Sequence, residues 1–289
     1  MSTFLVTGAS RGLGRAVVVA ALAAGHQVVA GVRDPHALDD LLGSADGRLV
    51  VVPLDVTDPA AAERAVHTVV DEFGRLDVLV NNAGYANLGS IEDTDPADFR
   101  AQVETNLFGV VNVTRAALPV LREQRGGHIV QVSSVGGRMA SAGLAAYQTA
   151  KWAVGGFSSV LAAEVEPLGI RVSVLEPGGM RTDWAGSSMR VDPVRPEYAE
   201  TVGANAARMG EAALTQASDP AKVAELVLRV VAMDEPPLRL LVGPDAYLYG
   251  TAVGRALLAA DEQNRELSES TVADDATAEQ LDPLGAAQR

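Results

Sequence analysis

The chain has 289 residues, of which 48% are hydrophobic and 21% charged, and its formal net charge is −14. This length can bury one sizeable core, and the acidic excess argues against nucleic acid as a partner. There is no cysteine, which excludes disulfides and thiolate metal sites, and the four histidines never fall at metal-ligand spacing, so we expect no metal.

The chain starts MSTFLVTGAS, without the basic segment and apolar run of a signal peptide. No apolar stretch reaches the roughly 18 residues that a membrane-spanning helix requires. We therefore expect a cytoplasmic protein that has no membrane partner.

Short apolar, β-branched runs recur along the chain and predict seven strands. These runs cover residues 3–7, 26–32, 48–54, 76–81, 127–133, 170–176 and 238–243. They are apolar throughout rather than alternating, as expected of parallel strands that are covered on both faces. Amphipathic stretches such as residues 14–25 and 59–74 lie between most of them. The pattern predicts an α/β fold, a Rossmann-type doubly wound parallel sheet of about seven strands in a three-layer αβα arrangement.

Two regions depart from this alternation. Residues 180–217 form a long connection without a strand, typical of a lid or binding loop, and we expect it to bind substrate. The end of the chain is rich in Asp, Glu, Ser and Ala. We therefore expect a single nucleotide-binding domain over residues 1–250 and a C-terminal extension over 251–289 whose acidic tail is loosely ordered.

A glycine-rich turn, LVTGASRGLGRA, follows the first predicted strand and opens the first helix. Gly8, Gly12 and Gly14 permit a tight turn, and the free N–H groups of a helix N-terminus favour a phosphate. The turn therefore predicts a dinucleotide site, to which Ser10, Arg11 and Leu13 also belong.

The end of the second strand bears on the choice between NAD and NADP. A carboxylate there would bind the ribose 2′-OH of NAD, but the chain reads AGVRD, so Arg33 precedes Asp34. Arg33 and Arg11 could clamp a 2′-phosphate, which favours NADP(H) over NAD(H). The alternative is that Arg33 is a solvated loop residue paired with Asp34.

Asp55 and Val56 follow the third strand in LDVTD. Val56 could contact the adenine while Asp55 accepts a hydrogen bond. Asp55 could equally be the N-cap of the helix that follows, and the sequence does not decide between the two.

A tyrosine and a lysine lie four residues apart in YQTAK. Residues at this spacing share one face of a helix, so Tyr147 and Lys151 can point at the same spot. A nearby ammonium stabilises a phenolate, and we expect it to lower the pKa of Tyr147 and make the phenol an acid–base group. Ser133 and Ser134, at the end of the fifth strand, could each polarise the reacting oxygen, and strand alternation sends them to opposite faces.

Six motifs occur in order and together resemble the short-chain dehydrogenase/reductase family in its single-domain form. They are TGASRGLG (7–14), NNAG (81–84), Asn106, Ser134, YQTAK (147–151) and PGGMRT (177–182). The resemblance covers residues 3 to about 245.

The resemblance implies roles for individual residues. Ser134, thirteen residues before Tyr147, would be the catalytic serine, and Asn106 would hold a water in the proton relay of the lysine. Tyr147 and Lys151 would also contact the cofactor. The remaining cofactor contacts would come from Asn82, Ala83, Gly84, Pro177, Gly178 and Thr182.

These observations predict an NADP(H)-dependent oxidoreductase, a carbonyl reductase or alcohol dehydrogenase with Tyr147 as general acid/base. One alternative is an epimerase or dehydratase of the extended family, which typically has a different glycine turn. Another is a non-catalytic NADP-binding regulator.

We expect a small, uncharged apolar carbonyl or alcohol as the substrate. The candidate pocket residues are Met139, Leu144, Met180 and Trp184. Small residues along 145–164 favour close helix packing, and the resemblance implies a homodimer or homotetramer.

Overall fold

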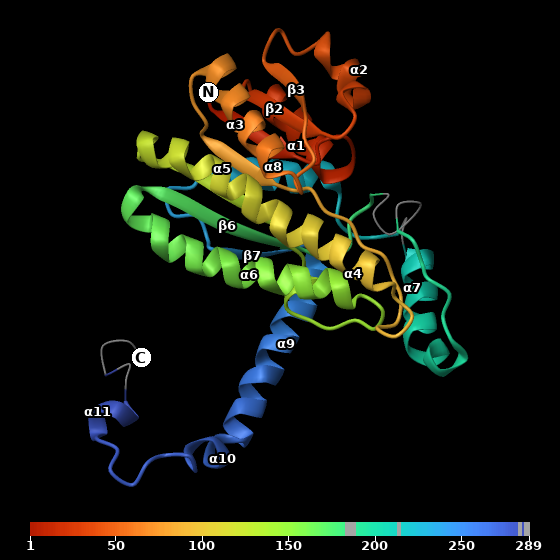
Figure 1. Ribbon diagram of the computed structural model, residues 1–289, viewed down its shortest axis with the longest axis vertical. Coiled ribbons are helices and arrows are strands. Elements are labelled where there is room, and N and C mark those ends of the chain that lie inside the picture. Colours follow the sequence, from red (N-terminus) through yellow and green to blue (C-terminus); the bar gives the residue numbers. More distant parts are fainter. Residues whose placement is uncertain (183–188, 213–214, 283–284, 286–289) are drawn as a thin grey trace. The chain divides into compact units, whose positions relative to one another are not determined.

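The computed structural model describes residues 1–182, 189–212, 215–282 and 285. It contains a parallel sheet whose strands match the predictions to within two residues at either end. The strands are β1 (Thr3–Thr7), β2 (Gln27–Val32), β3 (Leu49–Pro53), β4 (Val78–Asn81), β5 (Gly127–Val132), β6 (Ile170–Pro177) and β7 (Arg239–Val242). Their order is β3-β2-β1-β4-β5-β6-β7, and the predicted doubly wound fold is confirmed (Figure 1).

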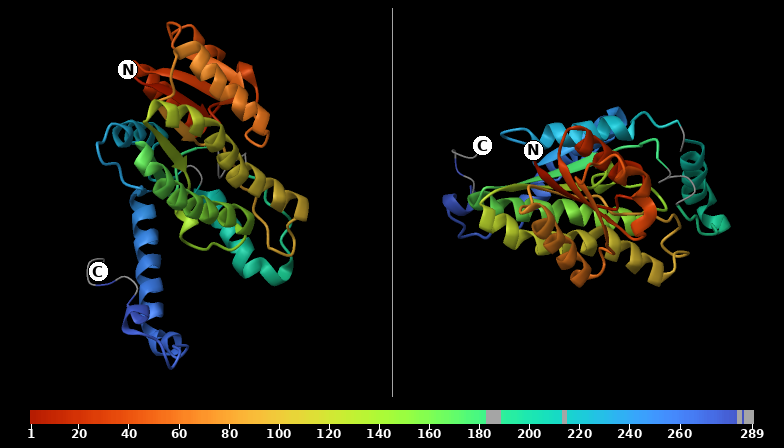
Figure 2. Two further views of the ribbon diagram at one scale, coloured as in Figure 1. Left: turned by 60° about the vertical axis from the view of Figure 1, so that its left-hand side comes forward. Right: turned by 90° about the horizontal axis from the view of Figure 1, so that it is seen from above.

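Helices cover both faces of the sheet. On one face lie α1 (Gly12–Ala23) and α8 (Pro220–Val231), and on the other lie α3 (Pro59–Phe73), α5 (Gly109–Gln124) and α6 (Ala145–Val165), as Figure 2 shows from above. Each face has its own apolar core, built on alternate residues of the same strands: Phe4 and Val6 face one core, and Leu5 faces the other. This double burial explains why the strands are apolar throughout.

Three helices begin at an Asp-Pro pair. The side chains of Asp58, Asp95 and Asp219 accept from the backbone N–H two residues on, at the starts of α3, α4 (Pro96–Val103) and α8. Proline fits the first helical position because its missing N–H is unpaired there in any case. Asp58, and not Asp55, therefore caps α3, and the N-cap alternative for Asp55 was wrong.

The connection between β6 and β7 contains helices and, in the part that is described, no regular strand. A short helix at Pro196–Tyr198, a π-turn at Ala199–Gly203 and α7 (Ala204–Ala212) precede α8. Met189, Val194 and Tyr198 pack against Leu88 and Leu144 in a small apolar cluster. These side chains thus hold the connection against the domain.

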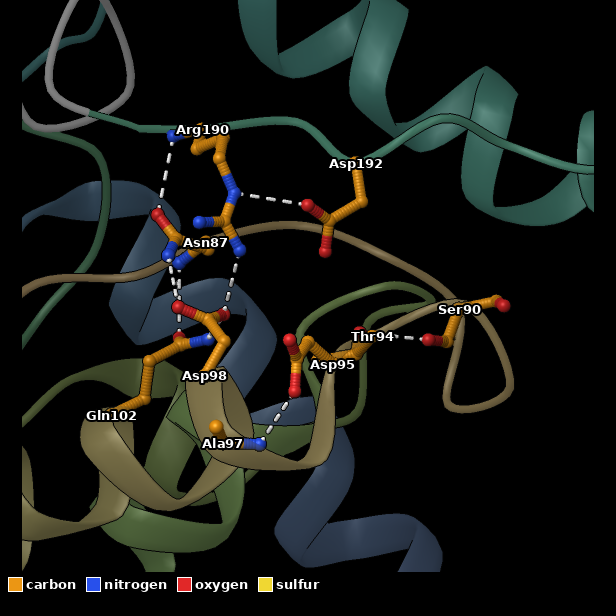
Figure 3. Close-up of polar contacts among 9 residues, drawn as sticks. All are labelled: Asn87, Ser90, Thr94, Asp95, Ala97, Asp98, Gln102, Arg190 and Asp192. Carbon is orange, nitrogen blue, oxygen red and sulfur yellow. Dashed lines mark hydrogen bonds and ion pairs between the residues drawn. The ribbon is translucent and has the colours of Figure 1, made fainter.

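Polar contacts tie the same connection to the loop after β4 and to α4 (Figure 3). The backbone N–H of Arg190 donates to Asn87 Oδ1 (3.2 Å). The guanidinium group of Arg190 forms ion pairs with Asp98 (3.2 Å) and Asp192 (2.9 Å). Arg195 pairs with Asp93 (2.6 Å) and with Glu92. The start of the connection is therefore held by two arginines whose charges are compensated.

The chain divides into two compact units, Met1–Gly250 and Thr251–Arg289. Helix α9 (Pro244–Gln263) continues into the second unit, which also contains α10 (Arg265–Glu269) and α11 (Ala278–Leu281). Short elements of the first unit are α2 (Asp39–Leu42) and turns at Pro35–Leu38, Val135–Gly137 and Glu166–Leu168. No helix in the described residues is long and apolar enough to cross a bilayer.

One histidine is buried in the sheet. His128 on β5 is 3% exposed, and its Nε2 lies 3.0 Å from Ser173 Oγ, which itself donates to the carbonyl of Pro237. The imidazole must therefore donate from Nε2, which leaves Nδ1 unprotonated. Burial, together with the nearby Arg171, lowers the pKa of His128 to about 4.

His128 is expected to make folding sensitive to acid. Between pH 6.5 and about 4 the unfolded chain binds a proton on this imidazole and the folded chain does not. Stability therefore falls as the pH falls, by up to about 3 kcal/mol from this group. Urea unfolding of wild type and His128→Gln at pH 7.5 and pH 5 checks this, with the exposed His67→Gln as control. An equally large acid loss in the wild type and the His128 variant would contradict it.

Candidate active site

A cavity of about 1020 Å³ opens at the carboxyl ends of the strands. This is where ligands bind in open α/β sheets. Most of the predicted site residues line it: Gly8, Ser10, Arg11, Gly12, Leu13, Arg33, Asp55, Val56, Asn82, Ala83, Gly84, Asn106, Ser134, Met139, Leu144, Tyr147, Lys151, Pro177, Gly178, Met180 and Thr182. Gly14 lies behind the wall, and Trp184 lies outside the described residues.

The glycine turn has the backbone that its sequence predicts. Gly8 and Gly12 have φ values of +63° and +55°, in the left-handed region that favours glycine. A Cβ on Gly14 would lie 2.4 Å from the carbonyl oxygen of Gly8, so Gly14 shapes the turn from behind. No side chain of the described chain caps the start of α1, and its first turn contains no acid, which leaves its N–H groups suited to a phosphate.

The NNAG segment braces this turn. Asn82 Nδ2 donates to the carbonyls of Thr7 (3.0 Å) and Gly8 (3.1 Å), and Thr7 Oγ1 accepts from the N–H groups of Asn82 and Ala83. A Cβ on Gly8 would lie 2.7 Å from Ala83 Cα, so the two backbones are in close contact. Asn82 therefore fixes the turn rather than offering its amide donors to the cavity.

Arg11 and Arg33 are exposed, line the cavity and form no ion pair with any described residue. Asp34 does not pair with Arg33; its carboxylate accepts from the N–H of His36 and caps the next turn. Asp55 accepts from the N–H (2.9 Å) and the hydroxyl (2.7 Å) of Thr57. These bonds, with the charge of Arg33, lower the pKa of Asp55. Both guanidinium groups are thus available for a phosphate.

Ser134 and Tyr147 meet at the cavity, and the geometry distinguishes Ser134 from Ser133. The Ser134 hydroxyl accepts from the N–H of Gly136 (3.0 Å) and forms a hydrogen bond with Tyr147. The Ser133 hydroxyl instead donates to the carbonyl of Lys151 (3.2 Å) on α6. Ser134 is therefore the serine that is placed beside the phenol.

Lys151 shares the face of α6 with Tyr147, as the spacing predicts. Its Nζ donates to the carbonyl of Val132 (2.8 Å) and lies 5.7 Å from the centroid of the Tyr147 ring. Burial lowers the pKa of Lys151 to about 8 and raises that of Tyr147 to about 12, the latter opposed by the bond with Ser134.

The expected lowering of the Tyr147 pKa is therefore not found in this structure, because desolvation of the buried phenolate outweighs the hydrogen bond with Ser134. At neutral pH the phenol stays protonated, which suits a proton donor.

Asn106 is fully buried on a π-turn, Glu104–Phe108, between α4 and α5. Its Nδ2 donates to the carbonyls of Tyr85 and Gln102 (2.8 Å each), and its Oδ1 accepts from the N–H of Tyr85 (3.2 Å). A Cβ on Gly84 would lie 2.5 Å from Asn106 Oδ1 and 3.5 Å from Lys151 Nζ, so Gly84 separates the two side chains. Asn106 thus fixes the loop that faces the lysine.

Comparisons with known proteins decide the family. The family model described as short chain dehydrogenase matches residues 2–191. Oxidoreductase BOA17 of Botryotinia fuckeliana (strain B05.10) is 53% identical over 266 residues, which cover 92% of this chain and 97% of that protein. The chain belongs to the short-chain dehydrogenase/reductase family. It is an oxidoreductase of that family.

Solved structures of short-chain dehydrogenases are similar to the chain along most of its length. The crystal structure of one from Streptomyces avermitilis is 38% identical, with a TM-score of 0.87, and the match covers 94% of this chain and all of that one. Another, from Burkholderia cenocepacia J2315, was solved in complex with NADP. It is 26% identical with a TM-score of 0.72, over 91% of this chain and 96% of that one. These likenesses support a nicotinamide cofactor.

The cavity has the features that such a dinucleotide needs. Close backbone approach at Gly8, the uncapped start of α1 and the guanidinium groups of Arg11 and Arg33, which have no ion-pair partner among the described residues, fit a pyrophosphate. Thr182 lies beside the turn, since a Cβ on Gly12 would be 3.6 Å from its Cγ2. Among the described residues no cluster of three or more His, Asp or Glu could hold a metal ion.

Behind this short-chain dehydrogenase site lies a buried carboxylate that sequence reasoning missed. Glu176, 1% exposed at the end of β6, pairs with Arg138 (2.5 Å) after the Ser134 turn and lies 3.8 Å from Arg239 of β7. The pair links the turn that carries Ser134 to β6, the strand that ends at Pro177. The charges are far apart in sequence and have no recognisable spacing, so only the fold brings them together.

Other cavity residues were also missed. Asp245, at the start of α9, accepts from the N–H of Gly179 (2.7 Å) and supports the Pro-Gly-Gly turn. Gln148, Asn205 and Arg208 also line the cavity. Gln148 could have been predicted from the sequence because it adjoins Tyr147. Asn205 and Arg208 could not, because they lie on α7, where the sequence contains no motif.

Proposed function

We propose that this protein is an NADP(H)-dependent oxidoreductase that interconverts a ketone or aldehyde with an alcohol. The observation that carries the proposal is the convergence of Ser134, Tyr147 and Lys151 on a cavity that also contains the glycine turn. A bound nicotinamide would supply or accept the hydride. The protein residues then need only orient the carbonyl and manage one proton.

The roles follow from the positions of the side chains. Ser134 would hydrogen-bond to the carbonyl oxygen and hold it beside the phenol, and Tyr147 would donate a proton to that oxygen as the alcohol forms. Lys151 carries its charge below a pH of about 8 and would stabilise the phenolate that is left.

The substrate body would lie against apolar side chains. Met139, Leu144 and Met180 line the cavity, and Leu144 packs in the same apolar cluster as Tyr147. This supports a carbonyl compound with an apolar body next to the reacting carbon.

The test is the oxidation of NADPH and NADH by the wild-type protein with a panel of aliphatic, aromatic and cyclic ketones. Turnover with NADPH supports the proposal. Tight NADPH binding without turnover of any carbonyl would favour a non-catalytic NADP-binding regulator instead.

Preference for NADPH would depend on Arg33. Replacing Arg33 by alanine is expected to weaken NADPH binding at least about tenfold, because a charge-assisted bond to the 2′-phosphate is lost, and to change NADH binding less than about threefold. Fluorescence titration with each cofactor measures this, with Arg122→Ala on the surface of α5 as control. Equal losses for the two cofactors would show that Arg33 does not bind the 2′-phosphate.

A further inference from the structure

Part of the cavity wall is polar and consists of residues to which the sequence motifs assign no role. It is formed by Ser141 and Gln148, at and before the start of α6, and by Asn205 and Arg208 on α7. Helix α7 lies at the end of the first unit away from β2 and β3, whose ends carry Arg33 and Asp55 (Figures 1 and 2). This polar wall is therefore separate from the part of the cavity that contains Arg33 and Asp55.

Hydrogen bonds fix the orientation of both amides on this wall. Gln148 Oε1 accepts from the N–H of Ser141 (2.8 Å), and Asn205 Nδ2 donates to the carbonyl of the next residue, Ala142 (2.7 Å). Asn205 Oδ1 then accepts from Arg208 Nη2 (2.6 Å). The loop residue Ser141 thus holds Gln148 directly, and its neighbour Ala142 holds Arg208 through Asn205.

No described residue compensates the charge of Arg208. Its only hydrogen bond within the described residues is to the neutral Asn205, and no described carboxylate lies within 4.0 Å. Arg190 and Arg195, in the same connection, are both paired with acids and do not line the cavity. A guanidinium that is oriented by an amide keeps its remaining donors for a ligand, and its planar fork suits a carboxylate or a phosphate.

Gln148 places a second donor of this wall close to the Ser134 hydroxyl. The residue is 8% exposed, and its Nε2 has no acceptor among the described residues. A Cβ on Gly136 would lie 3.2 Å from Gln148 Nε2 and 3.3 Å from Ser134 Oγ, so the amide and the catalytic hydroxyl border the same point. Gln148 lines the cavity, so its Nε2 can donate to a ligand there.

We propose that Arg208 recognises an anionic group of the substrate, a carboxylate or a phosphate, and that Gln148 donates to an oxygen between that group and the reacting carbonyl. The proposal rests on the proposed function and makes the substrate an acidic ketone with an apolar body, in place of the uncharged ketone expected from the sequence. Arg208 is then a specificity residue, because it contacts the substrate away from the reacting atoms.

The test compares charged and uncharged forms of one substrate. Methyl ketones that carry a terminal carboxylate at increasing chain length are assayed beside their methyl esters, and a matching phosphate monoester forms a third arm. The variants are Arg208→Gln and Arg208→Lys, with Arg229→Gln on the surface of α8 as control. Calorimetric binding of octanoate and octyl phosphate to the NADP-loaded protein gives a readout that needs no turnover.

Arg208→Gln is expected to lower kcat/KM for the preferred acid at least about tenfold, to change the ester less than about threefold, and to weaken binding of the matching octyl anion. Arg208→Lys should restore part of this loss. The anion that gives the higher kcat/KM and the tighter binding shows whether Arg208 recognises a carboxylate or a phosphate. Equal losses for acid and ester, weaker NADPH binding, or no anion binding would overturn the proposal. Absence of turnover with intact, Arg208-dependent anion binding would instead count against the proposed reaction.

Discussion

Replacing Tyr147 by phenylalanine is expected to reduce kcat/KM for ketone reduction by about 10²–10⁴, the usual contribution of a positioned general acid. The phenol is buried and forms a hydrogen bond with Ser134. The affinity for NADPH should change less than about tenfold, the loss of one hydrogen bond. Steady-state kinetics and cofactor titration measure the two effects separately.

A matched control is available on the neighbouring connection. Tyr198 donates from its hydroxyl to Glu92 (2.8 Å) and does not line the cavity. Tyr198→Phe should therefore retain activity within about twofold of wild type. Full activity in Tyr147→Phe would exclude Tyr147 as the proton donor.

Replacing Arg138 by methionine is expected to lower the free energy of unfolding by about 3–5 kcal/mol. The Glu176 side chain is only 2% exposed, and the substitution would leave Arg239, 3.8 Å away, as the nearest cation to its carboxylate. The free energy of unfolding falls because a buried charge without a close partner is costly. Urea unfolding at pH 7.5 measures the change. The surface pair Arg64–Asp58 (3.3 Å) is the control, and Arg64→Met should cost less than about 1 kcal/mol.

A double variant separates the charge effect from lost packing. If the buried charge is the cause, Arg138→Met combined with Glu176→Met should be more stable than Arg138→Met alone, because no carboxylate is then left unpaired. A change below about 1 kcal/mol for Arg138→Met, or an additive loss in the double variant, would contradict this account.

Local patterns were sufficient to predict the framework of the fold. The strands could be predicted because a strand that is covered on both faces is apolar at each position. The glycine turn could be predicted because Gly8 and Gly12 have positive φ values, which favour glycine. The Tyr147–Lys151 pair followed from helical spacing alone. The role of Asp55 was left open because two carboxylates compete within LDVTDP. The proline after Asp58 decides the cap.

What the sequence could not predict depends on burial and on contacts between distant segments. The pKa of Tyr147 is raised rather than lowered because both it and Lys151 are enclosed, which no spacing reveals. Glu176 and Arg138 lie 38 residues apart in the sequence, and the hydrogen bond from Asn205 to the carbonyl of Ala142 joins residues that lie 63 apart. These contacts place the residues that shape the cavity, and neither has a sequence signature.

The most direct test of the central claim follows the hydride itself. The wild-type protein is incubated with the best ketone of the panel and NADPH deuterated on the transferable position of the nicotinamide ring, and the alcohol is analysed by mass spectrometry and NMR. We predict one deuterium on the new carbinol carbon for each NADPH oxidised, with the loss of this product in Tyr147→Phe. Consumption of NADPH without deuterium at that carbon, or no consumption with any carbonyl, would contradict the account.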